Sequence, residues 1–184
     1  MIELWLVRHG ETEWSRSGRH TGTTDLPLTD AGELSARELA QRLAGTRFDH
    51  VLASPLQRAA RTAELAGFAD ARHDARLVEW NYGEYEGITT PQIRETEPGW
   101  TVWTHGARGG ETAGQIGARM DAVLADLPRE GRILVIAHGH TLRALTARWL
   151  GLPVPDGRLL KLDTATVSVL GHEREVPVIV RWNC

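Results

Sequence analysis

The run Arg132-Ile133-Leu134-Val135-Ile136-Ala137 decides the fold, and it continues directly into His138-Gly139-His140. The five consecutive apolar residues after Arg132 predict a β-strand that is buried on both of its faces. The chain then enters a predicted helix that ends near Leu150-Gly151, where the glycine can supply the C-cap. A buried strand that leads into a helix is typical of an α/β domain.

Two further strands are expected before this run. Residues 2–7 are mostly apolar and predict a short buried strand, followed by a polar, glycine-rich stretch at 8–27. Thr29 is a suitable N-cap for a helix with an apolar stripe near helical spacing. Residues 49–53 predict another strand, which passes through Ser54-Pro55 into a helix from about 56 to 67.

The remaining elements complete an alternation of strands and helices. A helix is expected over roughly 112–127, and the tail at 158–182 predicts two or three strands with turns at Asp163-Thr164 and Gly171-His172. Residues 76–90 have no clear period, and 91–110 are expected to be loop-like after one short helix. The alternation predicts a single α/β domain over 1–184, a three-layer sandwich with a mostly parallel central sheet and helices on both faces. In such folds ligands bind at the carboxyl ends of the strands.

The composition is that of an ordinary globular protein. Charged residues make up 24% of the 184-residue chain, hydrophobic residues 41%, and the formal net charge is −3. This balance predicts neither a basic face for nucleic acid nor a polybasic membrane patch. The one cysteine, Cys184, is the last residue and cannot close an intramolecular disulfide. The apolar N-terminal stretch is too short for a signal peptide, so we expect a cytoplasmic protein.

Two of the predicted strands end in histidines, one at Arg8-His9 and the other at His138. Neighbouring strands lie ~4.8 Å apart, so these ends can bring the two imidazoles to either side of one phosphate. A histidine at a strand end is more often a plain polar cap. Whether these two histidines are polar caps or catalytic residues must therefore be judged from the sequence around them.

Several blocks around these histidines carry a resemblance to a known family. They are Leu6-Val7-Arg8-His9-Gly10-Glu11-Thr12, the stretch GRHTGTTDLPLT at 18–29, Ser54-Pro55-Leu56-Gln57-Arg58-Ala59, Leu77-Val78-Glu79 with Gly83 and Glu86-Gly87, Gly110-Glu111-Thr112 and Ala137-His138-Gly139. In this order they resemble the histidine phosphatase superfamily, also called phosphoglycerate mutase-like. The blocks cover most of the chain, and the resemblance implies that family's fold. It is closer to the broad-specificity acid phosphatase members than to the cofactor-dependent mutases.

The resemblance implies a catalytic set. His9 is the nucleophile, because a neutral imidazole can attack phosphorus and hold the phosphoryl group as a labile phosphoramidate. Arg8, Arg58 and His138 contact the phosphate oxygens, which suits the planar, permanently charged fork of arginine. Glu79 is the general acid that protonates the departing alkoxide and then, as a base, activates the water that hydrolyses phospho-His9. This scheme needs no metal and no cofactor.

The resemblance also implies residues around the phosphate. Gly10 and Gly139 are expected to let the backbone approach it closely, and the N–H after His138 starts a helix, a natural anion site. Ser15 stands where the family usually has an asparagine, which puts one phosphate contact in doubt. The expected substrate-binding residues are Ser15, Thr21, Gly22, Trp80, Tyr82, Gly139 and His140.

Other polar residues near these blocks have plainer interpretations. Glu86 is expected to brace its loop through backbone hydrogen bonds, and Glu84 to be solvated. The histidines that are candidates to line the pocket, but that lack the short ligand spacing of zinc sites, are His20, His105 and His140. The residues that fall where the family builds its variable lid are Trp80, Tyr82, Trp100, Trp103, His105 and Arg108. For Trp80 and Trp103, an apolar pocket wall and ordinary packing stay equally open.

The motifs do not separate a phosphatase from a mutase, because both reactions begin with phospho-His9. Cofactor-dependent mutases carry an arginine directly after the acid, where this chain has Trp80, and an asparagine where it has His140. Their insertion with paired arginines is also missing, since only Arg94 and Arg108 occur between residues 87 and 110. Each lost charge-assisted hydrogen bond removes ~1.5–3 kcal/mol, which disfavours a doubly anionic substrate and favours hydrolysis.

We therefore expect a metal-independent phosphatase of the histidine acid phosphatase type, which hydrolyses small phosphate monoesters. The alternatives are a cofactor-dependent phosphoglycerate mutase, a phosphoprotein phosphatase acting on phosphohistidine or phosphotyrosine, and a non-catalytic binding module. The expected partner is a small phosphorylated metabolite, with no nucleic acid and no membrane. The oligomeric state stays open, a homodimer included.

Overall fold

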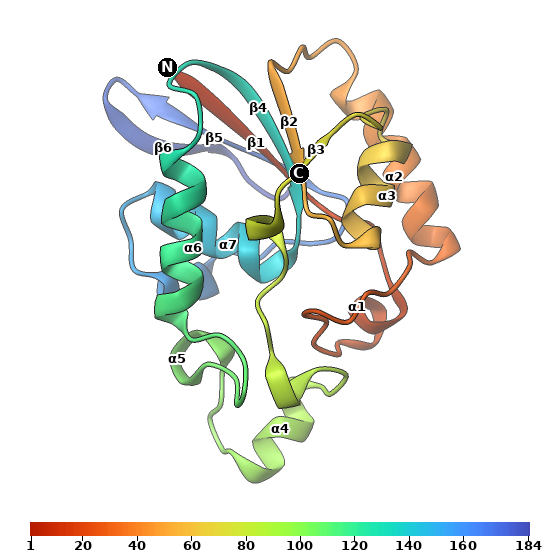
Figure 1. The fold of residues 1–184 in the computed structure, drawn as a ribbon, viewed down its shortest axis with the longest axis vertical. Helices are drawn as coiled ribbons and strands as arrows, with labels where there is room; N and C mark the ends of the chain where they lie inside the picture. Colours follow the sequence, from red (N-terminus) through yellow and green to blue (C-terminus); the bar gives the residue numbers. More distant parts are fainter.

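Six strands form one central sheet in the order β3-β2-β4-β1-β5-β6 in the computed structural model, which describes all 184 residues (Figure 1). The strands are β1 (Ile2–Arg8), β2 (His50–Ala53), β3 (Arg72–His73), β4 (Gly131–Ala137), β5 (Val167–Glu173) and β6 (Val176–Arg181). The first four are parallel to one another, and β5 and β6 are added antiparallel at the β1 edge. The sheet is therefore mostly parallel, as the sequence predicted.

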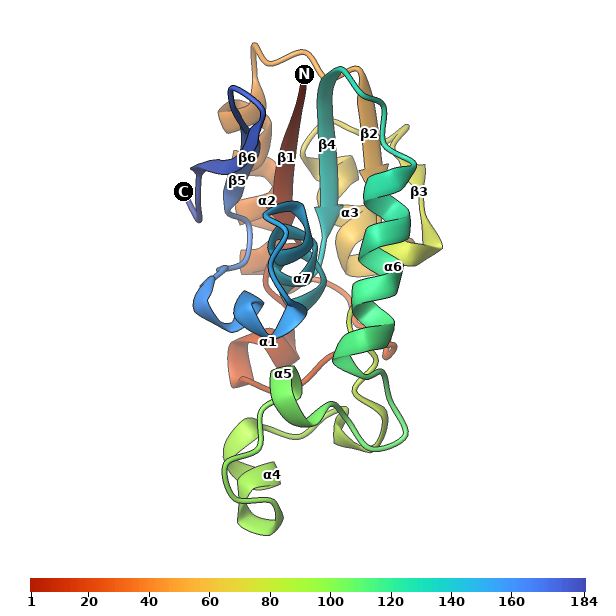
Figure 2. The same ribbon diagram turned by 90° about the vertical axis from the view of Figure 1, so that its left-hand side faces the viewer.

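Helices cover both faces of this sheet (Figure 2). They are α1 (Glu13–Ser17), α2 (Asp30–Leu43), α3 (Gln57–Leu65), α4 (Thr90–Thr96), α5 (Val102–His105), α6 (Ala113–Ala125) and α7 (Gly139–Trp149), with 3₁₀ helices at Ala75–Leu77 (η1), Gly83–Tyr85 (η2) and Val154–Leu159 (η3). Thr29 caps α2 through its side chain, as expected. None of the helices combines the length and the hydropathy that a membrane span requires.

Strand β4 lies between two hydrophobic cores, which explains its unbroken apolar run. On one face Leu134 and Ile136 pack with residues of α2 and α3; on the other Ile133 and Val135 pack with residues of α6 and α7. All five residues from Ile133 to Ala137 are fully buried, and burying each large aliphatic side chain contributes roughly 1.5–3 kcal/mol. The three-layer α/β sandwich is thus confirmed.

The two central strands place the histidines at the same edge of the sheet. Strands β1 and β4 are parallel neighbours in a register that sets Arg8 opposite Ala137. The next residue of each strand is His9 and His138, and the His9 N–H donates to the Ala137 carbonyl at 2.9 Å. Figures 1 and 2 both show α1, α4 and α5 beyond this carboxyl edge.

Some local expectations were wrong. The polar stretch at 8–27 contains α1, and 91–110 contains two short helices, α4 and α5, instead of one. The turn expected at Gly171-His172 does not exist, because both residues pair with β6 inside β5. The chain reverses instead at 174–175, where Arg174 takes a left-handed φ of 55°. Mirror-image hairpin turns require that conformation.

Candidate active site

His9 is held as a neutral imidazole with one free nitrogen. Its Nδ1 lies 2.7 Å from the carbonyl oxygen of Gly10. Because a carbonyl only accepts, Nδ1 carries the proton, and Nε2 keeps its lone pair. Burial lowers the pKa of His9 well below its ordinary value, and the charges of Arg8 and Arg58 lower it further. The side chain therefore presents an unprotonated Nε2, the state that a nucleophile needs.

His138 lies beside His9, with 5.1 Å between the two ring centroids. Its Nδ1 accepts a hydrogen bond from Arg58 Nε at 3.1 Å, so the proton is on Nε2, which donates to the hydroxyl of Ser54 at 2.7 Å. Burial lowers the pKa of His138 well below its ordinary value, and Arg58 is the next cause. The structure thus shows His138 orienting Arg58 and not offering a free donor to a phosphate, which differs from the contact we expected.

Arg58 is fully buried at the start of α3 and holds the loop that follows α1. Its guanidinium donates to the carbonyls of Thr21, Gly22 and Thr24. Glu86 holds the same loop from the other side, since its carboxylate accepts from the N–H and hydroxyl groups of Thr23 and Thr24. The bracing role expected of Glu86 is confirmed. Both contacts position the backbone around Arg58 relative to His9.

Arg8 has a buried donor with no partner. Its Nη1 donates to the Leu162 carbonyl at 2.6 Å, but its Nε is buried and has no hydrogen-bond partner. Side-chain donors of this kind are rare in folded proteins and require an explanation. No carboxylate forms an ion pair with this guanidinium. An anion bound between Arg8 and His9 would satisfy both the donor and the charge.

Glu79 is almost fully buried at the N-terminal turn of α7. Its Oε1 accepts from the N–H groups of Trp80 and Thr141 and from the Thr141 hydroxyl, whereas Oε2 accepts only from the N–H of His140, at 3.0 Å. The Glu79 carboxyl group therefore takes the N–H groups of His140 and Thr141 at this helix start, and the phosphate contact expected of the N–H that directly follows His138, on Gly139, stays a prediction. Oε2 has the open lone pair on which a transferable proton can be carried.

Two glycines make room for close packing at the site. A methyl group at Gly10 would overlap the carbonyl oxygen of Gly32, so Gly10 allows α2 to approach the strand end. A methyl group at Gly139 would lie 3.2 Å from Arg8 Nε, so Gly139 makes room for the guanidinium. The close approach of their backbone to a phosphate stays a prediction.

An aromatic wall covers the site from the loop at 79–105. The Tyr82 hydroxyl lies 2.6 Å from His140 Nδ1, and the His20 ring packs 4.8 Å from the Tyr82 ring. The Trp103 ring lies 5.0 Å from the His140 ring. His9 and Tyr82 expose only 4% and 2% of their surface, so the site is nearly closed.

Comparisons with known proteins agree with this geometry. The sequence model of the histidine phosphatase superfamily (branch 1) matches residues 4–184. This chain belongs to the histidine phosphatase superfamily. It is 43% identical to an acid phosphatase of Mycobacterium tuberculosis over 178 residues, covering 94% of this chain and 88% of that protein.

Further similarities of this histidine phosphatase span nearly its whole length. It is 34% identical to a probable phosphoglycerate mutase of Salmonella choleraesuis over 194 residues, covering 99% of this chain and 90% of that protein. A solved structure of an open reading frame product of Mycobacterium tuberculosis superimposes with a TM-score of 0.95 at 41% identity, covering 98% and 96% of the two chains. The relatives support a hydrolase that acts on phosphate esters.

The structure of this histidine phosphatase brings together most of the residues named from the sequence. The exception is His105, which is exposed at the end of α5, where its Nδ1 accepts from the Thr101 N–H. The Ser15 hydroxyl is engaged in the capping box of α1 with Thr12, so its phosphate contact stays a prediction. No group of three or more His, Cys, Asp or Glu side chains lies close enough together to hold a metal ion.

Trp80 belongs to the hydrophobic core. Its side chain is fully buried, its indole N–H donates to the Glu111 carbonyl at 2.9 Å, and its ring packs edge-on against Trp103 at 5.5 Å. Of the two interpretations left open for Trp80 and Trp103, the structure shows ordinary packing, and an apolar pocket wall stays a prediction. Both rings belong to the hydrophobic core, and the outer ring, Trp103, supports His140.

Sequence reasoning missed three residues of the site. Ser54 lies in the block Ser54–Ala59, but its hydrogen bond to His138 depends on strand pairing, and no motif marks Thr141. Arg143 lies on α7, outside the predicted lid region. Its signal was its spacing, since three residues after His140 on a helix is the same face.

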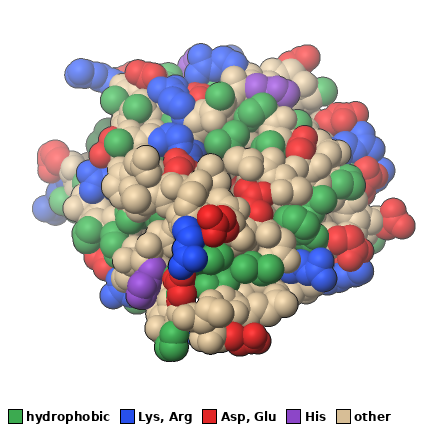
Figure 3. All heavy atoms as spheres, turned by 60° about the horizontal axis from the view of Figure 1, so that its bottom comes forward, with side chains coloured by type: hydrophobic (Ala, Val, Ile, Leu, Met, Phe, Trp, Pro, Cys, Tyr) green, Lys and Arg blue, Asp and Glu red, His purple; other side chains and the backbone are tan.

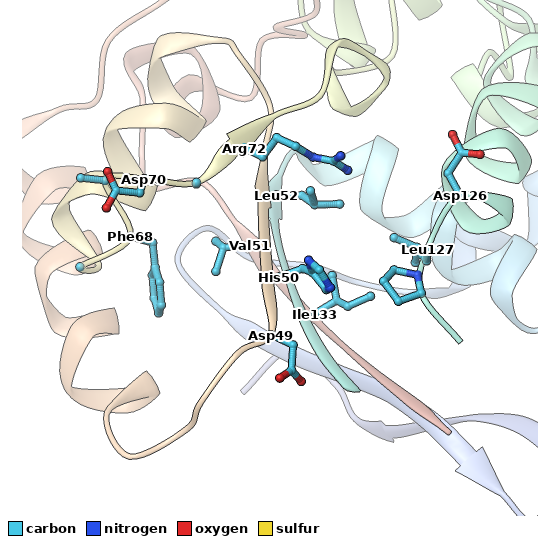
Figure 4. Close-up of a pocket in the computed structure, with 14 residues that line it drawn as sticks. Asp49, His50, Val51, Leu52, Phe68, Asp70, Arg72, Asp126, Leu127 and Ile133 are labelled. Atoms are coloured by element: carbon cyan, nitrogen blue, oxygen red, sulfur yellow. The ribbon is translucent and has the colours of Figure 1, made fainter. Parts of the chain in front are cut away.

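The surface shows two further features. The face at the carboxyl ends of the strands shows acidic and basic side chains interspersed, without a patch of one sign (Figure 3). A cavity of about 490 Å³ opens at the sheet edge, between β2, the segment after α3 and the end of α6 (Figure 4). None of the predicted site residues lines that cavity.

Proposed function

We propose that this histidine phosphatase hydrolyses small phosphate monoesters through a phospho-His9 intermediate and without a metal ion. The observation that carries the proposal is the hydrogen bond between His9 Nδ1 and the Gly10 carbonyl. It fixes the tautomer whose free Nε2 can attack phosphorus, and burial keeps that nitrogen unprotonated. The assignment is to the histidine acid phosphatase type, in line with the 43% identical relative.

The first step forms an N–P bond and breaks the ester P–O bond. His9 Nε2 attacks phosphorus, and the leaving alkoxide takes the proton from Glu79 Oε2. Charge on the transferring phosphoryl group is spread over its three equatorial oxygens, and fixed cations stabilise it there. Arg8 supplies the unpartnered Nε for this purpose, and Arg58 adds a second charge.

The second step breaks the N–P bond. Glu79, now a carboxylate, removes a proton from a water molecule whose oxygen attacks phosphorus, and inorganic phosphate leaves. His9 returns to its neutral tautomer, because Nδ1 keeps its proton throughout against Gly10. The same carboxyl group serves both steps, as microscopic reversibility allows.

The closed site favours a small substrate over a phosphoprotein. His138 and Arg58 have no exposed surface, and Glu79 exposes only 5%. A phosphorylated side chain on a folded protein would require a shallow, open cleft. A small metabolite can enter after local movement of the lid carried by α4 and α5.

Replacement of His9 tests the proposal. The His9→Ala variant should lose release of phosphate from p-nitrophenyl phosphate, whereas the exposed His50→Ala variant should keep it. The wild-type rate should survive EDTA, which supports the metal-free scheme. Substantial turnover by His9→Ala would remove His9 as the nucleophile, and loss of activity in EDTA that added metal restores would contradict metal independence.

A panel of phosphorylated metabolites separates hydrolysis from mutase chemistry. We expect hydrolysis of 3-phosphoglycerate to outpace its conversion to the 2-isomer, with or without 2,3-bisphosphoglycerate. The reason is that Trp80 and His140 replace two polar groups of the cofactor-dependent mutases. Isomerisation faster than hydrolysis would favour the mutase alternative.

A further inference from the structure

We propose that Arg143 binds a second anionic group of the substrate, so that the preferred substrates are phosphate monoesters that also carry a carboxylate or a further phosphate. This inference rests on the proposed function of the His9 site and specifies its substrate class. It adds a residue that none of the sequence blocks contains.

Arg143 lies on the same side of α7 as the aromatic wall. It follows His140 by three residues, and helical side chains lean toward the N-terminus, over the preceding turn. The guanidinium carbon stands 4.6 Å from the centre of the Trp103 ring. Trp103 packs against His140, whose N–H binds Glu79. A continuous line of contacts thus joins Arg143 to the catalytic carboxyl group.

The pattern of ion pairs singles out the arginines of this site. Four arginines that are not fully exposed pair with carboxylates, and these are Arg61, Arg76, Arg119 and Arg148. Arg58 is fully buried and Arg8 and Arg143 are partly buried, and none of the three forms an ion pair. A charge that is even partly withdrawn from water is stabilised by a counter-charge. A phosphate would bind at Arg8 and Arg58. By the same argument, the unpaired Arg143 marks a further position for negative charge.

The guanidinium of Arg143 is fixed with one nitrogen left open. Its Nε donates to the Gly157 carbonyl at 3.0 Å and its Nη2 to the Arg158 carbonyl at 3.1 Å, both in η3. Nη1 has no hydrogen-bond partner in the protein. The stacked indole and the two carbonyls hold the charged group in one orientation, so little ordering is needed when an anion binds.

Electrostatic influence of Arg143 extends into the site. Burial is the main cause that lowers the pKa of His140, and the charge of Arg143 is the next. The pKa of Arg143 itself is lowered by burial, while Tyr82 and Glu79 act in the opposite direction. Arg143 is therefore close enough to interact with the charged groups around the reacting phosphate.

The helix sets the spacing between the two anions. At about 1.5 Å per residue, the five residues from His138 to Arg143 correspond to roughly 7.5 Å along α7. A short phosphorylated acid or a sugar bisphosphate can span a distance of this order. Trp80, His140 and the missing lid arginines disfavour doubly anionic substrates, but Arg143 supplies a cation from a different element.

Matched substrate pairs test the proposal. Glycerol 3-phosphate differs from 3-phosphoglycerate only by a hydroxymethyl group in place of the carboxylate, and fructose 6-phosphate lacks one phosphate of fructose 1,6-bisphosphate. We expect wild-type enzyme to prefer the more anionic member of at least one pair. The preference is measured as kcat/KM for the more anionic member divided by kcat/KM for the other. In Arg143→Gln this ratio should fall about tenfold or more, mainly through KM, and Arg143→Lys should restore part of it. Arg148→Gln, on the same helix but paired with Asp121, should keep the wild-type ratio.

Binding of the same four esters to the His9→Ala variant tests the role of Arg143 without turnover. Calorimetry should show that adding Arg143→Gln to this variant weakens the binding of the more anionic ligand of the preferred pair about tenfold more than the binding of the other member. Equal losses for both members, or the absence of any anionic preference in both pairs, would overturn the role of Arg143. Failure of the proposed function would look different, because wild type would then hydrolyse none of the four esters.

Discussion

His9 Nδ1 lies 2.7 Å from the carbonyl oxygen of its own neighbour, Gly10. This short-range contact determines the tautomer of His9, because it places the proton on Nδ1 and leaves Nε2 with a free lone pair for the proposed attack on phosphorus. Burial and the two nearby arginines keep the ring neutral. The pairing of strands β1 and β4 then brings His138, together with its hydrogen-bond partner Arg58, next to His9.

Buried neutral histidines should make the protein less stable in acid. Burial lowers the pKa of His20 to about 4 in the folded protein, whereas an unfolded histidine titrates near ~6.5. Between these values the unfolded chain binds more protons, so the free energy of unfolding falls as the pH falls, by up to about 1.4 kcal/mol per pH unit for one histidine. Urea denaturation from pH 7 to pH 4.5 should show this loss.

Removing one of these histidines should reduce the pH dependence. His20→Asn should lose less stability than wild type over the same pH range, and His50→Ala, which changes an exposed ring, should follow wild type. Identical slopes for His20→Asn and wild type would show that His20 does not contribute to acid sensitivity.

Glu79→Gln should slow poor leaving groups far more than good ones. The amide can keep the backbone hydrogen bonds at Oε1 but cannot donate a carboxylic proton, and general acid catalysis contributes about 10²–10⁴-fold. Steady-state kcat/KM for glycerol 3-phosphate and p-nitrophenyl phosphate measures the difference. The control is Glu84→Gln, an exposed carboxylate in the same loop. If Glu79→Gln slowed both substrates equally, the acid would have to be another group.

Arg58→Lys should reduce kcat/KM by at least tenfold. Lysine keeps the charge but cannot donate at once to His138 and to the three loop carbonyls that Arg58 binds. Arg61→Lys, one turn further along α3 and paired with Glu33 and Glu64 near the surface, is the matched control. Comparable losses in the two variants would argue against a special role for the planar fork at Arg58.

Gly10→Ala should destabilise the fold by about 1–3 kcal/mol, the usual effect of overpacking. Its methyl group would overlap the Gly32 carbonyl. Gly114→Ala in α6 has open space and a helical backbone, so it should be neutral or stabilise by about 0.5–1 kcal/mol. Thermal unfolding of both variants is the measurement. An unchanged Tm for Gly10→Ala would mean that α2 can move away without loss.

The sequence predicted the strand ends, the two histidines and Glu79, because these depend on local patterns and on blocks that stand in a fixed order. It could not predict the partner of His138, since Ser54 and Arg58 reach it only after β2 and β4 pair. The contacts of Glu79 with the N–H groups of His140 and Thr141 could not be predicted for a similar reason, because Glu79 reaches the start of α7 from a loop distant in the sequence.

Contacts between residues that lie far apart in the sequence were the hardest to predict. Arg143 meets Trp103 only because α5 packs against η3 and α6, and nothing in the spacing of Arg143 and Trp103 along the chain indicates that approach. Short elements were also missed, since α1 and β3 have five and two residues and carry almost no periodic signal. The residues proposed to bind the reacting phosphate were thus easier to identify than Arg143, which we propose to select the rest of the substrate.

Rapid-quench trapping of the phosphoenzyme tests the central claim most directly. Wild-type protein mixed with labelled substrate should yield a phosphoenzyme that is stable in base and labile in acid, with the phosphate on Nε2 of His9. It should decay to inorganic phosphate at least as fast as kcat, and His9→Ala should trap none. A wild-type label on any residue other than His9, or turnover with no trapped intermediate and an unaffected His9→Ala variant, would contradict the account.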